Sequence, residues 1–125
     1  MAMIDKDAFA ASLNKDPEFA VACRFFNGSM KLEMGDEPVL LTFRDGKLTE
    51  LGVADTFDAA DVAIKGSEDD WREFLQPIPK PFYHDMFAAV VREGFEWSGD
   101  VVTLFAYYGA FRRMFDVMRD NATLQ

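Results

Sequence analysis

The chain has 125 residues, a formal net charge of −9 and a single cysteine, and 50% of its residues are hydrophobic. This composition excludes a disordered tail, and no apolar run approaches the roughly 20 residues that a membrane span needs. The acidity argues against nucleic acid as a partner, and Asp5, Lys6 and Asp7 interrupt any signal peptide, so we expect one cytoplasmic domain over residues 1–125.

The N-terminal segment favours two helices. Asp5 is placed to cap a helix over residues 6–14, and Asp16-Pro17 restarts the chain as an N-cap followed by proline. The second helix is expected to end near Asn27-Gly28. Its apolar side consists of Phe19, Ala22, Cys23 and Phe26. The lone cysteine is therefore expected in the core, because a catalytic thiol needs a basic neighbourhood.

From Ser29 onward apolar and polar residues alternate, which predicts strands. We expect four of them, over about 30–34, 39–44, 47–53 and 61–65. Asp45-Gly46 is typical of a two-residue hairpin turn. Because the connections between these strands are short, the pattern favours an antiparallel meander over a parallel sheet.

The C-terminal half returns to helical periodicity. Ser67 followed by Asp70 predicts a capped helix whose apolar face holds Trp71, Phe74 and Leu75. Three prolines between 77 and 81 then enforce an extended link. A helix over 82–93, a short strand at 95–98 and a long helix over 101–120 complete an α+β pattern.

The predicted terminal helix has more apolar surface than packing on a sheet requires. Its charged side chains fall within one sector, and the opposite arc holds Leu104, Tyr107, Tyr108, Phe111, Met114, Phe115 and Met118. Before Gly109 the helix is apolar almost all round, since Val101, Val102 and Phe105 occupy the polar side. Neighbouring helices could cover this surplus. Otherwise it faces a hydrophobic ligand or another chain.

The chemistry-bearing residues do not predict an enzyme. His84 is the only histidine, and the sequence has no glycine-rich phosphate loop, nucleophile elbow or cysteine pair. We therefore expect no catalytic residue, no metal and no cofactor. The 13 Phe and 7 Met residues indicate either an aromatic core or an apolar cavity with large, adaptable walls.

Three short motifs follow one another along the chain. They are Phe43-Arg44-Asp45-Gly46, then Ala60-Asp61-Val62-Ala63-Ile64-Lys65-Gly66-Ser67 with Asp70-Trp71, and last Phe95-Glu96-Trp97-Ser98-Gly99-Asp100 leading into Leu104-Phe105. In this order and spacing they resemble the sterol carrier protein type-two domain family, over about residues 18–120.

The resemblance implies an α+β fold with a mainly antiparallel sheet of about five strands, covered by helices, and a long C-terminal helix closing an apolar tunnel. It implies non-catalytic carriage or presentation of a fatty acid, acyl-CoA, sterol or similar lipid. The residues expected to line the tunnel are Phe105, Tyr108, Phe111, Met114, Phe115, Met118, Trp97, Phe87 and Phe82. Tyr108 or His84 would meet a polar head group.

The chain differs from the family in two respects, and two alternative functions stay open. The chain ends in residues 121–125 without a peroxisomal signal, and its acidity provides no basic patch for anionic membranes. One alternative is a small isomerase or hydratase acting on an apolar ketone, which needs a carboxyl of raised pKa, with Asp61 or Asp100 as candidates. The other is a homodimer or accessory module that pairs through the terminal helix. The sequence does not identify the ligand, the pathway or the oligomeric state.

Overall fold

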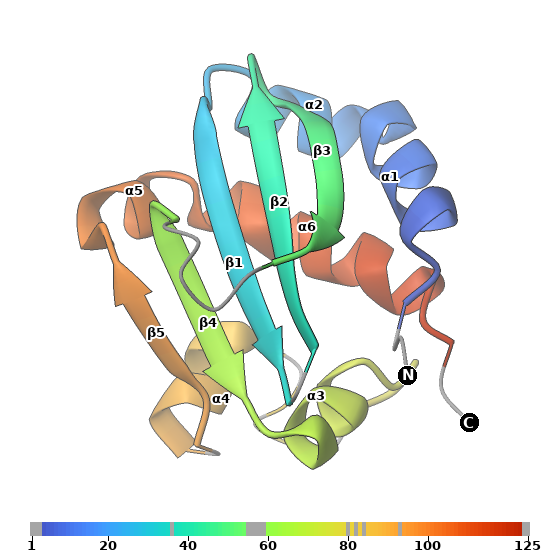
Figure 1. Ribbon diagram of the computed structural model, residues 1–125, viewed down its shortest axis with the longest axis vertical. Coiled ribbons are helices and arrows are strands. Elements are labelled where there is room, and N and C mark those ends of the chain that lie inside the picture. Colours follow the sequence, from blue (N-terminus) through green and yellow to red (C-terminus); the bar gives the residue numbers. More distant parts are fainter. Residues whose placement is uncertain are drawn as a thin grey trace.

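A mixed five-stranded sheet with helices gathered on one of its faces organises the protein (Figure 1). The computed structural model describes residues 4–35, 37–54, 60–79, 81, 83, 85–92 and 94–123. The strands are β1 (Gly28–Met34), β2 (Glu37–Arg44), β3 (Lys47–Val53), β4 (Val62–Gly66) and β5 (Glu96–Gly99). The helices are α1 (Lys6–Lys15), α2 (Pro17–Cys23), α3 (Glu68–Phe74), α4 (Met86–Arg92), α5 (Val101–Ala106) and α6 (Tyr108–Asp120).

The predicted local signals form as expected in the first half of the chain. The Asp5 and Asp16 carboxylates accept backbone N–H groups at the starts of α1 and α2. At the hairpin between β2 and β3, Asp45 and Gly46 both have positive φ angles, of 50° and 78°, which is the geometry of a two-residue turn. Helix α2 ends earlier than predicted, at Cys23, and Ala22 on its expected buried side is exposed.

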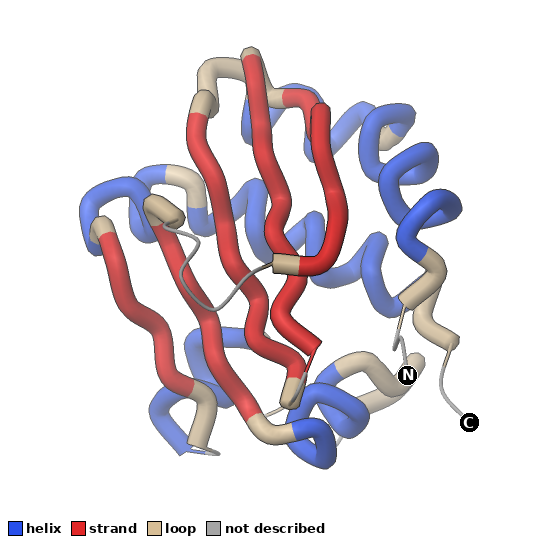
Figure 2. Tube along the Cα trace, viewed as in Figure 1, coloured by secondary structure: helices blue, strands red, loops and turns tan. Residues whose placement is uncertain are grey.

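The prediction of a purely antiparallel meander is wrong for β4. The strand order is β3-β2-β1-β4-β5, with the strands side by side in Figure 2, and β4 pairs with β1 in parallel, as their arrows show in Figure 1. In that place Val62 and Ile64, both fully buried, extend the apolar rows begun by Met30 and Leu32 of β1. The rest of the sheet is antiparallel, so the predicted mainly antiparallel α+β fold is confirmed.

The single terminal helix expected over 101–120 is instead two helices. The helical backbone breaks at Tyr107, whose φ of −111° and ψ of 19° end α5 and begin α6. Its N–H bonds to the carbonyls of Phe105 and Thr103. The break lies just before Gly109, and glycine lowers helix propensity there. The predicted straight helix would be apolar on almost every side in its first turns. Because of the break, α5 and α6 are separate helices, and α5 need not continue along the axis of α6.

Helices α3 and α4 frame the lower end of the sheet in Figure 1. The Ser67 hydroxyl caps α3 by accepting the N–H of Asp70, as predicted, and Trp71, Phe74 and Leu75 are buried. Helix α4 begins at Met86, later than the predicted residue 82. The chain ends lie side by side, joined by an isolated bridge between Ile4 and Ala122.

Candidate functional site

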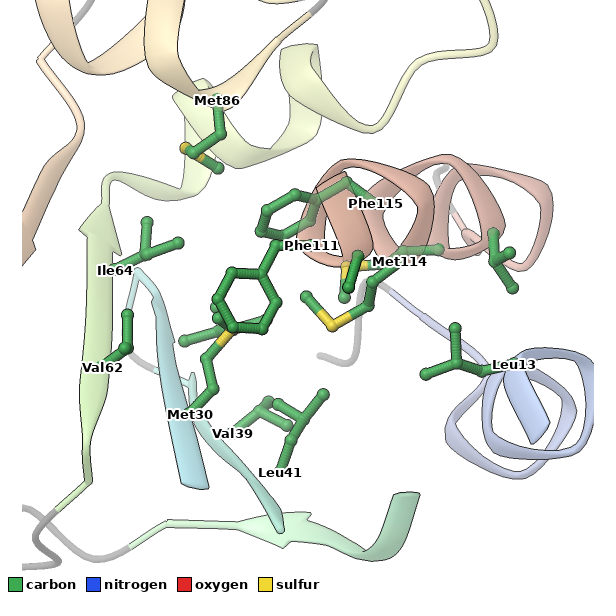
Figure 3. Packing of buried hydrophobic residues seen from close by; sticks show 14 of the residues in the cluster. Leu13, Met30, Val39, Leu41, Val62, Ile64, Met86, Phe111, Met114 and Phe115 are labelled. Carbon is green, nitrogen blue, oxygen red and sulfur yellow. The ribbon is translucent and has the colours of Figure 1, made fainter. Parts of the chain in front are cut away.

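The inner face of the sheet is a layer of apolar side chains that points toward α6 (Figure 3). Its alternating residues form rows across neighbouring strands, because side chains that face each other in register share one face. One row runs from Val62 through Met30 to Leu41, and the next from Ile64 through Leu32 to Val39. All six side chains are almost fully buried.

Helix α6 supplies the opposite wall of this layer. Four of the predicted lining residues, Phe111, Met114, Phe115 and Met118, lie on its buried face and are at most 3% exposed. In Figure 3 the side chains of Phe111 and Met114 extend toward those of β1 and β2. Where the resemblance implies a tunnel, the described residues thus form one continuous cluster of buried apolar side chains.

Aromatic rings concentrate at the two ends of this cluster. At one end Phe26 contacts the rings of Phe43, Tyr107 and Phe111, at centroid distances of 4.9 to 5.7 Å. At the other end Trp71, Phe74, Phe95 and Phe115 pack mostly edge to face. Such ring pairs fix each other's orientation. Unbranched methionines, Met30 and Met114, belong to the same buried cluster, and their side chains repack easily.

Three other predicted lining residues that the structure describes lie outside this buried set of side chains. Phe105 is 54% exposed on α5, where its ring packs edge-on against Trp97 of β5. Trp97 and Tyr108 are half-buried, and their rings also contact each other. The predictions for Phe82, for His84 and for the side chain of Phe87 lie outside the described residues.

A polar edge of α6 faces the segment that leads into α4. Tyr108 donates its hydroxyl to Asp85 Oδ1 at 2.5 Å, and Arg112 Nε lies 3.6 Å from the same oxygen. One and two turns further along, Asp116 and Arg119 pair at 3.0 Å. A hollow of about 30 Å³ opens between these groups. It is lined by Phe74, Asp85, Met86, Arg112, Phe115, Asp116 and Arg119.

Arg119 connects α6 to the segments on the other side of this hollow through hydrogen bonds. Its Nε donates to the carbonyl of Phe74 at 2.8 Å, its Nη2 to the carbonyl of Tyr83 at 3.1 Å, and its guanidinium lies 4.4 Å from the Phe74 ring centre. Burial lowers the pKa of Arg119 from its ordinary value, partly offset by Asp116. Asp85, Arg112 and Arg119 are not among the site residues predicted from the sequence. The spacing of Tyr108, Arg112 and Arg119 on one side of α6 was the available signal.

The carboxylates proposed for an enzymatic alternative have structural partners. Asp61 Oδ2 accepts the N–H of Ser29, which joins the starts of β4 and β1. Asp100 caps α5, and hydrogen bonds from the Thr103 hydroxyl and backbone hold its pKa below the ordinary range. Asp100 is therefore not a carboxyl of raised pKa, which the isomerase or hydratase reading requires.

Metal sites and membrane spans are two further features that a candidate site could involve. Within the described ranges, no group of three or more His, Cys, Asp or Glu side chains is arranged to hold a metal ion. In the same part of the chain, no helix has the length and apolar character to cross a bilayer.

Comparison with known proteins gives a result at the level of the fold. No protein-family model matches the sequence, and no curated protein matches it significantly. The structure is similar to the crystal structure of sterol carrier protein 2, with a TM-score of 0.76 and 22% identity over 93% of this chain and 94% of that chain.

Two other solved structures have the same architecture. The conserved hypothetical protein TT1886 of Thermus thermophilus, described as possibly a sterol carrier protein, has a TM-score of 0.71 and 22% identity, over 90% of this chain and 82% of that chain. The UbiJ-SCP2 ubiquinone synthesis protein has a TM-score of 0.58 and 14% identity, over 90% of each chain. The chain therefore has the sterol carrier protein 2 fold, as the motifs of the sequence predict.

Proposed function

We propose that this protein binds and carries a hydrophobic small molecule, a fatty acyl chain, sterol or similar lipid, between the inner face of its sheet and α6. One observation carries the proposal. The fold of sterol carrier protein 2, a protein named for carrying sterols, extends over 93% of this chain. In this chain, the apolar layer between the sheet and α6 would contact the ligand, and Met30, Phe111 and Met114 belong to this layer.

Ligand uptake requires the buried layer to open. Methionine has three rotatable bonds and a polarisable sulfur, so Met30 and Met114 can repack around a ligand at low cost. The aromatic groups at both ends of the layer stay packed and define the length of the space. Burial of ligand surface then contributes roughly 25 cal/mol per Å², before the entropic cost of association.

Native mass spectrometry of the purified protein, followed by denaturing extraction, tests the proposal first. We expect a stoichiometric apolar molecule that is released on denaturation. After delipidation, a long-chain alkyl probe bearing a diazirine is added and cross-linked by light. We expect cross-links on the peptides that contain Met30, Leu41 and Met114.

Two results would count against this function. Absence of both a co-purifying molecule and probe binding would remove the carrier role. Cross-links confined to the exposed residues of α5 and of the turn after α2, such as Val102 and Phe25, would place the ligand on the surface instead.

The exposed face of α5 favours a second candidate, an interaction module that pairs with another copy. Val101, Val102 and Phe105 are 57%, 78% and 54% exposed. Light scattering over a range of concentrations separates the two functions. A carrier predicts the same mass for the wild type and for Val102→Glu at every concentration, whereas a pairing module predicts a dimer that this substitution dissociates.

A further inference from the structure

The hollow beside α6 has the composition of a head-group site. Three of its lining residues are apolar and almost fully buried: Phe74, Met86 and Phe115 are at most 3% exposed. Its rim is polar and carries Asp85, Arg112, Asp116 and Arg119. Met86 and Phe115 belong to the same buried cluster as the sheet's inner face, and Figure 3 shows their side chains in that cluster, so the hollow adjoins the apolar interior.

Resting on the carrier function proposed above, we propose that this hollow binds the hydroxyl group of a neutral, alcohol-type lipid. Asp85 accepts a hydrogen bond from this hydroxyl, and Arg112 donates a hydrogen bond to its oxygen. The alkyl or ring system would extend past Met86 into the apolar layer. This assigns the ligand class as alcohols rather than carboxylic acids.

The hydrogen-bonding state of the rim supports a hydroxyl. Both described side-chain contacts of Asp85 go to Oδ1, from Tyr108 and Arg112, so in the described part of the chain Oδ2 keeps its acceptor capacity. The Asp85 side chain is 23% exposed and Arg112 65% exposed, so both can reach a ligand at the rim. Arg119, in contrast, already donates from Nε, Nη1 and Nη2 to protein oxygens.

The charge of the hollow disfavours a carboxylate. Its two arginines are balanced by Asp85 and Asp116, so a bound carboxylate adds an uncompensated negative charge in a protein of net charge −9. The hollow is small, about 30 Å³, which is enough for a polar head group of a few atoms. A hydroxyl fits this space, and it both donates and accepts, as the rim requires.

The test compares a ligand pair that differs only in its head group. Delipidated protein at pH 7.5 is loaded with the neutral fluorescent probe N-phenyl-1-naphthylamine, which 1-dodecanol or dodecanoate then displaces. In the wild type we expect the alcohol to displace the probe at least about tenfold more effectively, the scale of one hydrogen bond to a charged group.

Two substitutions on the rim should move this ratio in opposite directions. Asp85→Asn removes the negative charge, so the preference for the alcohol should fall by about tenfold. Arg112→Gln removes the guanidinium that would offset the charge of bound dodecanoate beside Asp85, so the preference for the alcohol should rise about threefold. Because Arg112 is exposed, Arg112→Gln should fold normally and still tests the proposal if Asp85→Asn folds poorly. Asp120→Asn, an exposed residue at the end of α6, is the charge-matched control and should leave the ratio unchanged.

The outcomes separate the two proposals. If the probe and both ligands bind but neither rim substitution changes the ratio, the head group lies elsewhere and this inference is wrong, while the carrier function stands. A wild-type preference for dodecanoate also overturns it. If neither the probe nor a ligand binds, the carrier function fails and this inference fails with it.

Discussion

Asp16 joins two helices that are far apart in the sequence. Its carboxylate accepts the N–H of Phe19 at the start of α2, and it also accepts two hydrogen bonds from Arg113 of α6, at 2.8 and 3.0 Å. Arg113 holds the pKa of Asp16 below its ordinary value, partly against desolvation. One side chain therefore acts as a helix cap and as a link between the N-terminal helices and the layer that covers the sheet.

We expect Asp16→Ala to lower the free energy of unfolding by about 2–3 kcal/mol at pH 7, because it removes the cap and the pair. Asp16→Asn keeps an acceptor for Phe19 and should cost about 1 kcal/mol. A depressed pKa means stability that is present above the unfolded-state pKa of about 3.9 and lost as the pH falls through the folded value. Urea unfolding at pH 7 and below pH 4 tests both effects.

The same experiment contains its control. The difference between the wild type and Asp16→Asn should shrink toward zero in acid, whereas exposed Asp120→Asn should show no such pH dependence. A constant difference across this pH range would mean that the ion pair with Arg113 does not contribute to stability.

Cys23 is a core residue, as its position on the apolar side of α2 predicts. It is fully buried, and burial raises the pKa of its thiol to about 11. At pH 8 only about one thiol in a thousand is then the reactive thiolate. We expect alkylation by iodoacetamide, followed by mass spectrometry, to be at least about a hundredfold slower in the native protein than in urea-unfolded protein. Comparable rates would show that α2 opens readily.

At the scale of elements, glycines in the C-terminal half have opposite roles. Gly109 lies in the first turn of α6, and a Cβ placed on it meets no atom within 4 Å. Gly99 has a φ of +101°, and its Cβ would lie 2.3 Å from the carbonyl oxygen of Asp61. The first position tolerates a side chain, and the second requires glycine because β5 closes against β4 there.

We therefore expect Gly109→Ala to raise the free energy of unfolding by about 0.5–1 kcal/mol, the usual gain of alanine over glycine in an exposed helix. Gly99→Ala, the contrasting variant, should lower it by more than that amount. Chemical unfolding of both proteins provides the measurement. If Gly109→Ala is destabilising, the break at Tyr107 depends on the freedom of glycine rather than on packing.

At the scale of the whole molecule, the fold places one apolar layer between a sheet and the helices on its inner face, of which α6 is the longest. A ligand that enters this layer binds only the folded state, so it must raise stability by mass action. At a free concentration about one hundred times its Kd, the gain is about 2.7 kcal/mol. For a chain of this length that corresponds to roughly 10 °C in Tm.

A thermal-shift series with delipidated protein measures this effect. We expect 1-dodecanol to raise Tm in a concentration-dependent way. The matched short alcohol, 1-butanol, buries far less surface and should not. An equal response to both would indicate solvent action on the protein and not binding in the layer.

The features that were predicted correctly from the sequence are those that depend on local chemistry. The caps at Asp5, Asp16 and Ser67 and the Asp45-Gly46 turn act within a few residues, so the pattern predicts where α1, α2 and α3 begin and where the hairpin turns. The spacing of Phe111, Met114, Phe115 and Met118 likewise predicts their burial, because one face of a helix must pack on the sheet.

The contacts between distant segments became visible only in the folded chain. No local signal places β4 beside β1, since short connections favour neighbouring strands and the parallel pairing is set by burial of Val62 and Ile64. At the break between α5 and α6, the ring of Tyr107 contacts Phe26, which lies far earlier in the sequence. The hydrogen bond from Tyr108 to Asp85 joins residues that are 23 positions apart. Contacts over such separations arise from packing of the whole chain, which patterns of a few residues do not encode.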